Sequence, residues 1–352
     1  MYYDIYRSKN RRERPERGER RQRRSCLGWL IRKIIQLVCI ALVLLIAAGA
    51  VMYFIPFSFL NTQPVGTQLS LTGSLPSNRL NILFLGLDAE SDGFRRSDSM
   101  MIVSLGKNDV RMVSLMRDTM VDIPGYGRGK LNSAYSHGGA ELTMQVVNQT
   151  FGMNITNYVA VDMQTLVELI DAVGGIDIEV STNELDQLNW CAKNTFARAN
   201  SANPEKYNME YLQERYGANA MEYNITAADI SPNGTIHLDG LYATGYARIR
   251  KIDSDFNRTS RQRKVLSAVM NKMLDSCTNP SLYKNLYGIY RDSMETNISL
   301  PKLISIGTKA LAVKDIQSHR LPENSNLQDN YSSLEIVDKE KNIQSLYKFL
   351  YE

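Results

Sequence analysis

The sequence predicts an α/β or α+β sandwich, a central mixed β-sheet flanked by helices, behind a single N-terminal transmembrane helix. Strand-like segments alternate with helix-like segments over most of the chain, which is typical of such folds. One long uncharged stretch lies near the N-terminus. Apolar residues make up 43% of the 352 residues, which is enough for a packed core and excludes a wholly disordered chain.

The N-terminal segment carries a charge signal followed by an apolar one. Residues 1–33 hold 12 basic and 4 acidic residues, and residues 34–55 hold no charge. Such a stretch of 22 residues is long enough to cross a bilayer as a helix. A cleaved signal peptide is the alternative, with Ala47-Ala48-Gly49 as its small-residue stretch.

The orientation of this span follows from the basic residues just before it. Positive charge stays on the cytoplasmic side, so we expect a single-pass protein of the cell membrane with a cytoplasmic N-terminus and an extracellular C-terminal domain. The basic arm is expected to attract anionic lipid. We expect no nucleic-acid partner, because the arm contains no DNA- or RNA-binding motif.

The extracellular part is expected to begin with a stalk at 56–78, rich in Pro, Gly, Ser, Thr and Asn, and to continue as one domain at 79–352. Three strands are predicted at 80–87, 99–105 and 110–116. The short turn between the last two makes them antiparallel neighbours. If the three strands form a meander, charged residues of both signs meet at one edge of the sheet; these are Asp88, Asp98, Arg117 and Asp118, with Arg95 and Arg96 in the connecting loop.

Further along, a glycine-rich segment at 127–139 holds Lys130 and Asn132. Helical spacing of apolar residues predicts helices at 140–151 and 163–173, the second ended by Gly174-Gly175, and a strand at 176–180. The polar segment 184–232 is predicted to be a surface insertion of short helices and loops. Beyond it, helices are predicted at 264–274 and 281–291, near Thr296 and at 340–351, with a short strand at 332–337.

A dense basic cluster lies at 247–264, within an extracellular part whose acidic residues outnumber its basic ones. Arg248 and Arg250 would share a face if extended, and Arg258 and Gln262 would share one if helical, with Arg261 beside them. Arginine binds phosphate through two parallel hydrogen bonds. This pattern favours a phosphate site over a merely solvated basic surface.

The four cysteines are too few for a disulfide scaffold. Cys26 and Cys39 lie beside and within the predicted span. Cys191 and Cys277 lie in the extracellular part, where an oxidising compartment would permit a disulfide, but sequence spacing does not determine their geometry.

Several stretches of the chain together resemble the LytR–CpsA–Psr family of cell-wall assembly proteins. The resemblance covers about residues 79–265 and keeps the family's order and approximate spacing. The matching stretches are LNILFLGLD (80–88), RRSDSMMIVSL (95–105), VSLMRDTMVDIPGYG (113–127), GKLNSAYSHGG (129–139), YVAVDM and LVELIDAVGGIDIEV (within 158–180) and LDGLYATGYARIRKIDSDFNRTSRQR (238–263).

This resemblance implies a hydrophobic lipid pocket within the fold and a phosphotransferase activity. Such proteins move a glycopolymer from an undecaprenyl-pyrophosphate carrier to peptidoglycan and release undecaprenyl phosphate. Met116 departs from the family, which often has proline before Arg-Asp.

The resemblance also implies residue roles. Asp88 and Asp98 would hold Mg²⁺ or Mn²⁺, and Arg96 and Arg117 would contact the pyrophosphate. A second basic wall would be formed by Arg248, Arg250, Arg258 and Gln262, with Arg261 as a further substrate-binding residue. Asp118 would support Arg117 or the metal. Asp255 would orient Arg258 or take part in proton transfer. Lys130 and Asn132 would shape or line the site.

The implied reaction agrees with the general chemistry of phosphoryl transfer and of divalent cations. Phosphoryl transfer is catalysed mainly by positioning and by charge stabilisation, and a hard divalent cation prefers oxygen ligands. Two alternatives remain at this point: a non-catalytic regulator that binds polyprenyl lipids, and a hydrolase that uses water as the acceptor at the same site.

Overall fold

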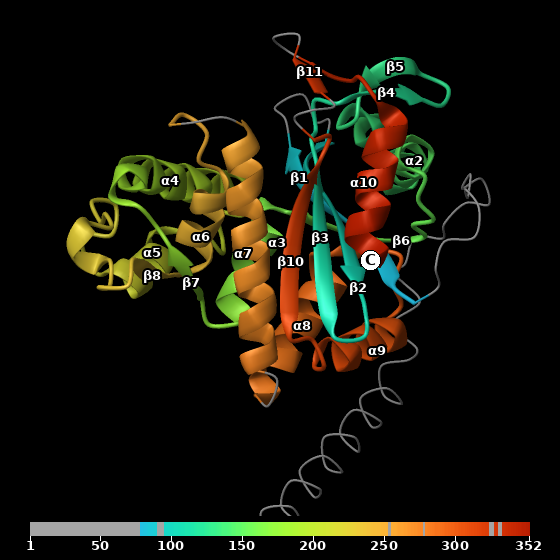
Figure 1. Cartoon of the computed structure of the whole chain (residues 1–352). Coiled ribbons are helices and arrows are strands. Elements are labelled where there is room, and N and C mark those ends of the chain that lie inside the picture. The colour runs from blue at the N-terminus through green and yellow to red at the C-terminus, as the bar shows by residue number, and fades with distance from the viewer. Residues whose placement is uncertain (1–77, 90–94, 253–254, 277–278, 324–326, 330–332) are drawn as a thin grey trace, which may run out of the picture. The chain divides into compact units, whose positions relative to one another are not determined.

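The computed structural model describes residues 78–352, except 90–94, 253–254, 277–278, 324–326 and 330–332. Its centre is a six-stranded mixed sheet with the strand order β10-β3-β2-β1-β6-β9 (Figure 1). The predicted arm, transmembrane segment and stalk lie outside the described residues. The strands of this sheet are β1 (Leu80–Ala89), β2 (Arg95–Leu105), β3 (Asp109–Leu115), β6 (Asn157–Asp162), β9 (Glu295–Thr296) and β10 (Asp315–Leu321).

The predicted meander is confirmed. β1 pairs antiparallel with β2, and β2 pairs antiparallel with β3 across a turn closed by the Gly106 N–H bonding to the Asp109 carbonyl at 2.9 Å. β6 adds to β1 in parallel, and β10 adds to β3 in parallel. Because the chain runs up, down and up, the end of β1, the start of β2 and the end of β3 lie at the same edge of the sheet.

The two faces of the sheet are covered by different helices. One face, which includes Leu85, Ile102 and Val113, packs against α2 (Ser133–Phe151) and α10 (Lys339–Tyr351). The opposite face, which includes Val103 and Met112, packs against α7 (Asp255–Asp275) and α9 (Leu300–Ala310). Alternate residues of each strand therefore serve two separate apolar layers.

A second apolar cluster lies beside the sheet and involves α3 (Met163–Ala172), α4 (Leu185–Ala202), α6 (Gly240–Ala247), α7 and α8 (Pro280–Asp292). All eight residues of α6 are buried. α4 packs directly on α6, and a Cβ atom built at Gly245 would lie only 2.8 Å from the Ala192 nitrogen. Glycine at this position therefore permits the close approach of the two helices.

The segment 184–232 differs from the prediction. It contains the short helix α5 (Met209–Tyr216) and the 3₁₀ turn Ala227–Asp229, and a further 3₁₀ turn (Thr182–Glu184) leads into it. However, α4 is a helix of 18 residues that buries six side chains. The buried residues recur every three or four positions, as in an amphipathic helix; they are Leu185, Leu188, Cys191, Ala192, Thr195 and Ala199.

Other differences concern pairing and boundaries. The predicted strand at 176–180 is present as β7 (Ile176–Glu179), but it pairs with β8 (Thr235–Leu238) in a separate ribbon. The glycine-rich segment forms β5 (Gly127–Lys130), which pairs with β4 (Met120–Ile123). The helix containing Pro301 begins at Leu300, after β9. β11 (Leu327–Asp329) and β12 (Leu334–Ile336) form a last ribbon before α10.

Cys191 is a buried free thiol, and burial raises its pKa; Cys277 lies outside the described residues. Among the residues that the structure describes, no helix combines the length and the apolar character that a bilayer span requires.

Candidate functional site

Charged side chains gather at the sheet edge where β1 and β3 end and β2 begins. Asp88 lies near the end of β1, its Cα paired with that of Arg96 on β2, and Asp98 follows two residues later. Arg117, just after β3, donates from Nη1 to Asp98 Oδ2 at 2.6 Å and from Nε to Asp118 Oδ2 at 3.3 Å. One guanidinium therefore bridges two carboxylates, as the meander predicted.

The Lys-x-Asn segment supports these carboxylates. Lys130 Nζ donates to Asp118 Oδ1 at 3.0 Å, and Asn132 Nδ2 donates to Asp98 Oδ1 at 3.3 Å. Burial tends to raise the pKa of Asp118, but Lys130 and Arg117 outweigh it and lower that pKa. Asp118 is thus an ionised group that positions Arg117, one of the two roles anticipated for it.

A basic wall faces this edge from the first turn of α7. Arg258 lies within 2.8 Å of Asp255 Oδ1 and donates to Oδ2 at 3.0 Å, while Arg250 Nη2 lies 3.8 Å from Oδ1. Asp255 therefore orients Arg258. Burial lowers the pKa of Arg258 to about 10; Asp255 opposes this shift, and the nearby charges of Arg117 and Arg250 add to it.

Arg248 caps the C-terminus of α6 and is held by α4. Its two terminal nitrogens donate to Thr195 Oγ1 at 3.0 Å and to Asn194 Oδ1 at 3.1 Å. Further along α4, Arg198 Nη1 donates to Asp88 Oδ1 at 2.9 Å. Burial lowers the pKa of Arg248, and the neighbouring charge of Arg198 lowers it further.

Sequence reasoning missed Arg198 and Asn194, because the segment that contains them was taken for a surface insertion. The signal that could have revealed α4 is its apolar spacing, which places six side chains in the core.

Two residues of α7 differ in their placement. Gln262 Oε1 accepts a hydrogen bond from Ser99 on β2 at 3.0 Å, so it lies beside the edge. Arg261 is buried and donates to Glu184 Oε1 at 2.8 Å and to the Ile249 carbonyl at 3.3 Å. Arg261 therefore joins α7 to the start of α4 and does not lie beside Arg258 at the sheet edge.

We refer to the charged groups at this edge as the edge cluster. Seven basic side chains stand among four carboxylates, an excess of three positive charges. Its members are Asp88, Arg96, Asp98, Arg117, Asp118, Lys130, Arg198, Arg248, Arg250, Asp255 and Arg258. Such an excess at partly buried positions suits a ligand with more than one negative charge.

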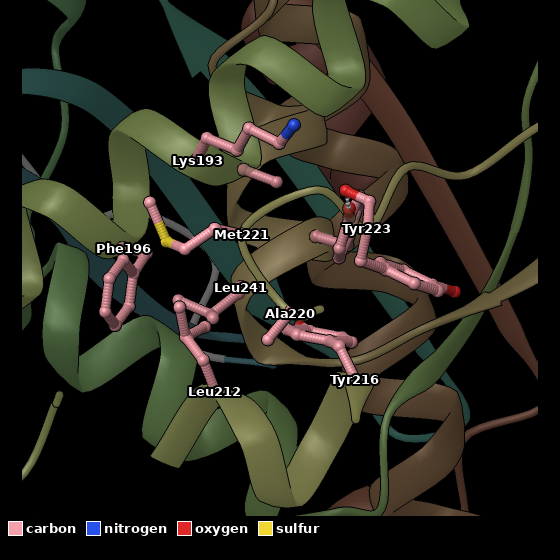
Figure 2. Close-up of a pocket in the computed structure, with 10 residues that line it drawn as sticks. Lys193, Phe196, Leu212, Tyr216, Ala220, Met221, Tyr223 and Leu241 are labelled. Atoms are coloured by element: carbon pink, nitrogen blue, oxygen red, sulfur yellow. Dashed lines mark hydrogen bonds between the residues drawn. The ribbon is translucent and has the colours of Figure 1, made fainter. Parts of the chain in front are cut away.

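A pocket elsewhere in the molecule is small. Figure 2 shows it between α4, α5 and the chain around Tyr223, lined among others by Phe196, Leu212 and Met221. Its volume of about 30 Å³ is roughly that of two water molecules. It is therefore far too small for a polyprenyl chain.

The described residues contain no group of three or more His, Cys, Asp or Glu side chains arranged to hold a metal ion. Asp88 and Asp98, the two carboxylates expected to hold a metal, lie on the neighbouring strands β1 and β2.

The LytR_cpsA_psr family model matches residues 60–348. The chain belongs to this family. The predicted family membership is therefore confirmed, and with it the mixed sheet flanked by helices.

Named relatives of this LytR–CpsA–Psr protein agree with the assignment. The polyisoprenyl-teichoic acid–peptidoglycan teichoic acid transferase TagU of Enterococcus faecalis is 30% identical over 78% of this chain and 79% of its own length. The TagU protein of Oceanobacillus iheyensis is 30% identical over 65% of this chain, and the match spans 62% of that relative.

Solved structures share the fold. TagT bound to LIIa-WTA has a TM-score of 0.59 at 22% identity, over 82% of this chain and 98% of that one. TagT with bound octaprenyl pyrophosphate lipid has a TM-score of 0.55 at 19% identity, over 82% and 98%. At these identities the likeness establishes the common architecture.

Proposed function

We propose that this LytR–CpsA–Psr protein is a phosphotransferase that moves a glycopolymer from an undecaprenyl-pyrophosphate carrier to peptidoglycan. The observation that carries the proposal is the edge cluster, in which Arg117 and Arg258 converge on one end of the sheet among carboxylates that orient them. The named activity of the TagU relatives supports the same conclusion.

The proposed reaction breaks the pyrophosphate bridge. A sugar hydroxyl of peptidoglycan attacks the phosphorus that bears the glycan and gives up its proton to water. The bond to the bridging oxygen breaks, and undecaprenyl phosphate leaves with that oxygen. Negative charge grows on the phosphate oxygens during this step, so fixed cations stabilise the transition state more than the ground state. Arg117, Arg250 and Arg258 are partly preorganised for this task by their ion pairs with Asp98, Asp118 and Asp255.

An unsatisfied hydrogen-bond donor of Arg258 supports the binding of an anionic ligand at this site. Its Nε atom is buried and has no hydrogen-bond partner within the described part of the chain. An ordered water, an ion or a ligand oxygen can satisfy a buried donor of this kind. A phosphate oxygen would satisfy it and would also offset the mutual repulsion of Arg258, Arg117 and Arg250.

We propose Mg²⁺, or Mn²⁺, as the cofactor, held by Asp88 and Asp98. The donor set fits, because Mg²⁺ is commonly bound by one or two carboxylates together with substrate phosphate oxygens and water. When bound, the ion would supply Lewis-acid stabilisation of the phosphate oxygens. The chain's own residues hold the two carboxylates in place: Arg198 contacts Asp88, and Arg117 and Asn132 contact Asp98.

We place the polyprenyl chain on the sheet face that α7 and α9 cover. Phe84 and Val103 of central strands, and Leu266 and Met270 of α7, are apolar but only partly buried. α9 buries none of its residues fully. This looser apolar layer lies towards the end of the sheet opposite the edge cluster, and Phe84 lies between the two. A lipid tail in this layer would have to run along the strands from a pyrophosphate at the sheet edge.

We also propose that the protein is anchored by residues 34–55, with the domain outside the cell. A span of this composition next to a basic arm is the basis for that placement. It would bring the enzyme to the same bilayer as its lipid-linked donor.

The decisive experiment uses the full-length protein in detergent, a synthetic polyprenyl-pyrophosphate glycan, Mg²⁺ and peptidoglycan oligomers. Polyprenyl phosphate release and glycan attachment are both followed, with Asp88→Ala as control. We expect attachment that requires the metal and is lost in the variant. Release without attachment would identify a hydrolase, and tight lipid binding without either product would identify a lipid-binding regulator.

A further inference from the structure

One face of α4 runs alongside the edge cluster. Trp190, Asn194 and Arg198 follow one another at intervals of four residues, so they lie on the same side of the helix. We call these three residues the α4 stripe. Arg198 contacts Asp88, and Asn194 contacts Arg248, so two of the three positions already belong to the site.

The third position of the stripe, Trp190, is exposed. Half of its surface (51%) is open to solvent, although tryptophan is usually well buried. Lys251 lies over its ring, with Nζ 4.6 Å from the ring centroid. Lys251 follows Arg250, whose guanidinium pairs with Asp255 in the edge cluster. Trp190 is therefore tied to the site from two elements, α4 and the segment after α6.

The distance along the stripe is fixed by helix geometry. Eight residues of α-helix rise about 12 Å, and four residues rise about 6 Å. If a phosphate binds at the edge cluster, the exposed ring of Trp190 lies about 6 to 12 Å from it along α4. One or two sugar units can span this distance.

We propose that the face of the Trp190 ring that Lys251 does not cover is a platform for one sugar ring of the glycan substrate, with the Lys251 ammonium group near enough to bond a ring hydroxyl. A pyranose has an apolar face of C–H groups, which packs on the electron-rich face of an aromatic ring. Its hydroxyls need polar partners at the rim, and the ammonium group of Lys251 supplies donors there.

This inference rests on the proposed function. The sugar ring that packs on Trp190 belongs either to the pyrophosphate-linked donor or to the peptidoglycan acceptor, because both substrates carry sugars.

Binding is measured by tryptophan fluorescence. The whole chain has only two tryptophans, Trp29 and Trp190. In full-length Trp29→Phe protein the signal therefore reports Trp190 alone. We expect a sugar-bearing ligand to change this signal: either a short-prenyl pyrophosphate glycan, which identifies the donor, or a peptidoglycan oligomer, which identifies the acceptor. Prenyl pyrophosphate without sugar should leave it unchanged.

Three results of this titration would overturn the proposal. These are no response to either sugar ligand, an equal response to the sugar-free pyrophosphate, and a response to anionic vesicles alone, which would make Trp190 a membrane contact.

Steady-state kinetics supply the second test. We expect Trp190→Ala to raise the KM of the donor or of the acceptor about fivefold, from the usual strength of a stacking contact, with kcat much less affected. Trp190→Tyr should restore most of the affinity. Tyr283→Ala is the matched control, since Tyr283 is an aromatic residue of equal exposure (50%) on α8.

The two proposals fail in different ways. Unchanged KM values in a Trp190→Ala protein that transfers glycan would refute the platform alone. A wild-type protein that transfers nothing with any glycan would instead refute the phosphotransferase, whatever the fluorescence shows.

Discussion

At the scale of single residues, Arg117 is the cation on which the proposed chemistry depends most. It bridges Asp98 and Asp118, and burial, which tends to lower its pKa, is outweighed by Asp98, Asp118 and Asp255, which raise it. We expect Arg117→Ala to lower kcat for transfer about 100- to 1,000-fold, the loss usual for one preorganised donor. The measurement is the rate of glycan attachment at saturating donor.

The control for Arg117 is Arg291→Ala. Arg291 is an exposed arginine near the end of α8 that pairs with Asp292, so its removal should leave the rate unchanged. Thermal unfolding of both variants shows whether they are folded. Wild-type transfer by a folded Arg117→Ala protein would remove Arg117 from the mechanism.

Arg198 holds Asp88 by an ion pair that a metal ion would have to share or displace. Both side chains are partly exposed, and such pairs contribute about 0.2–1 kcal/mol. We expect Arg198→Gln to lower the Mg²⁺ concentration for half-maximal transfer about twofold to fivefold. A Mg²⁺ titration tests this separately from the maximal rate, and an increase in the half-maximal concentration would contradict it.

At this scale the sequence predicted which charges meet but not all of their partners. The ends of three strands placed Asp88, Asp98 and Arg117 correctly, because a meander leaves little freedom there. Arg261 and Arg258 lie three residues apart with the same chemistry, yet one packs against Glu184 and the other against Asp255. Spacing alone does not determine which side of a helix meets the core.

At the scale of elements, the contact between α4 and α6 fixes the position of the α4 stripe. A Cβ atom at Gly245 would meet the backbone of Ala192, which cannot move without the whole helix. We expect Gly245→Ala to destabilise the protein by about 1–3 kcal/mol, as overpacking does, and to reduce transfer. Urea unfolding measures the loss.

Gly288→Ala is the matched control for Gly245. Gly288 lies within α8, and its added methyl group would meet nothing within 4 Å. Alanine there should stabilise the protein by about 0.5–1 kcal/mol through helix propensity. Equal effects of the two substitutions would mean that the α4–α6 contact is not tight.

A second prediction at this scale concerns the loose apolar layer under α7. Met270 faces Val103 and Met112 and is only partly buried, so a larger side chain there would compete with a lipid tail. We expect Met270→Trp to raise the KM of a long-chain polyprenyl donor at least threefold and to leave that of a short-chain donor unchanged. Equal effects on both donors would place the lipid elsewhere.

Most elements with strong apolar periodicity were predicted, α4 being the exception, whereas elements whose position depends on neighbouring segments were not. β1 is largely an apolar run, β3 is apolar apart from Asp109, Arg111 and Ser114, and α3 shows clear helical spacing. β10, by contrast, is a largely polar strand, DIQSHRL, that pairs with β3 through its backbone. β7 is strand-like in sequence, but its choice of β8 as a partner depends on the fold around it.

At the scale of the whole molecule, charge is divided along the chain. The first 33 residues carry a surplus of basic groups, residues 56–352 contain more acidic than basic residues, and that stretch nevertheless gathers a local positive excess at the edge cluster. A local positive excess of this kind attracts phosphates to that end of the sheet. The basic arm would hold the N-terminus at the cytoplasmic leaflet.

The proposed anchor leads to a prediction about where the enzyme works. A protein and a donor held in the same bilayer meet at a raised effective concentration, which can be worth a factor of about 100 or more. We expect removal of residues 1–55 to slow transfer from a long-chain donor embedded in vesicles by at least tenfold. Transfer from a water-soluble short-chain donor should be unaffected, since the edge cluster is untouched. Replacing residues 34–55 with an unrelated apolar span of equal length should restore the vesicle rate. Equal rates for the truncated and full-length proteins on vesicles would show that the anchor does not deliver the donor.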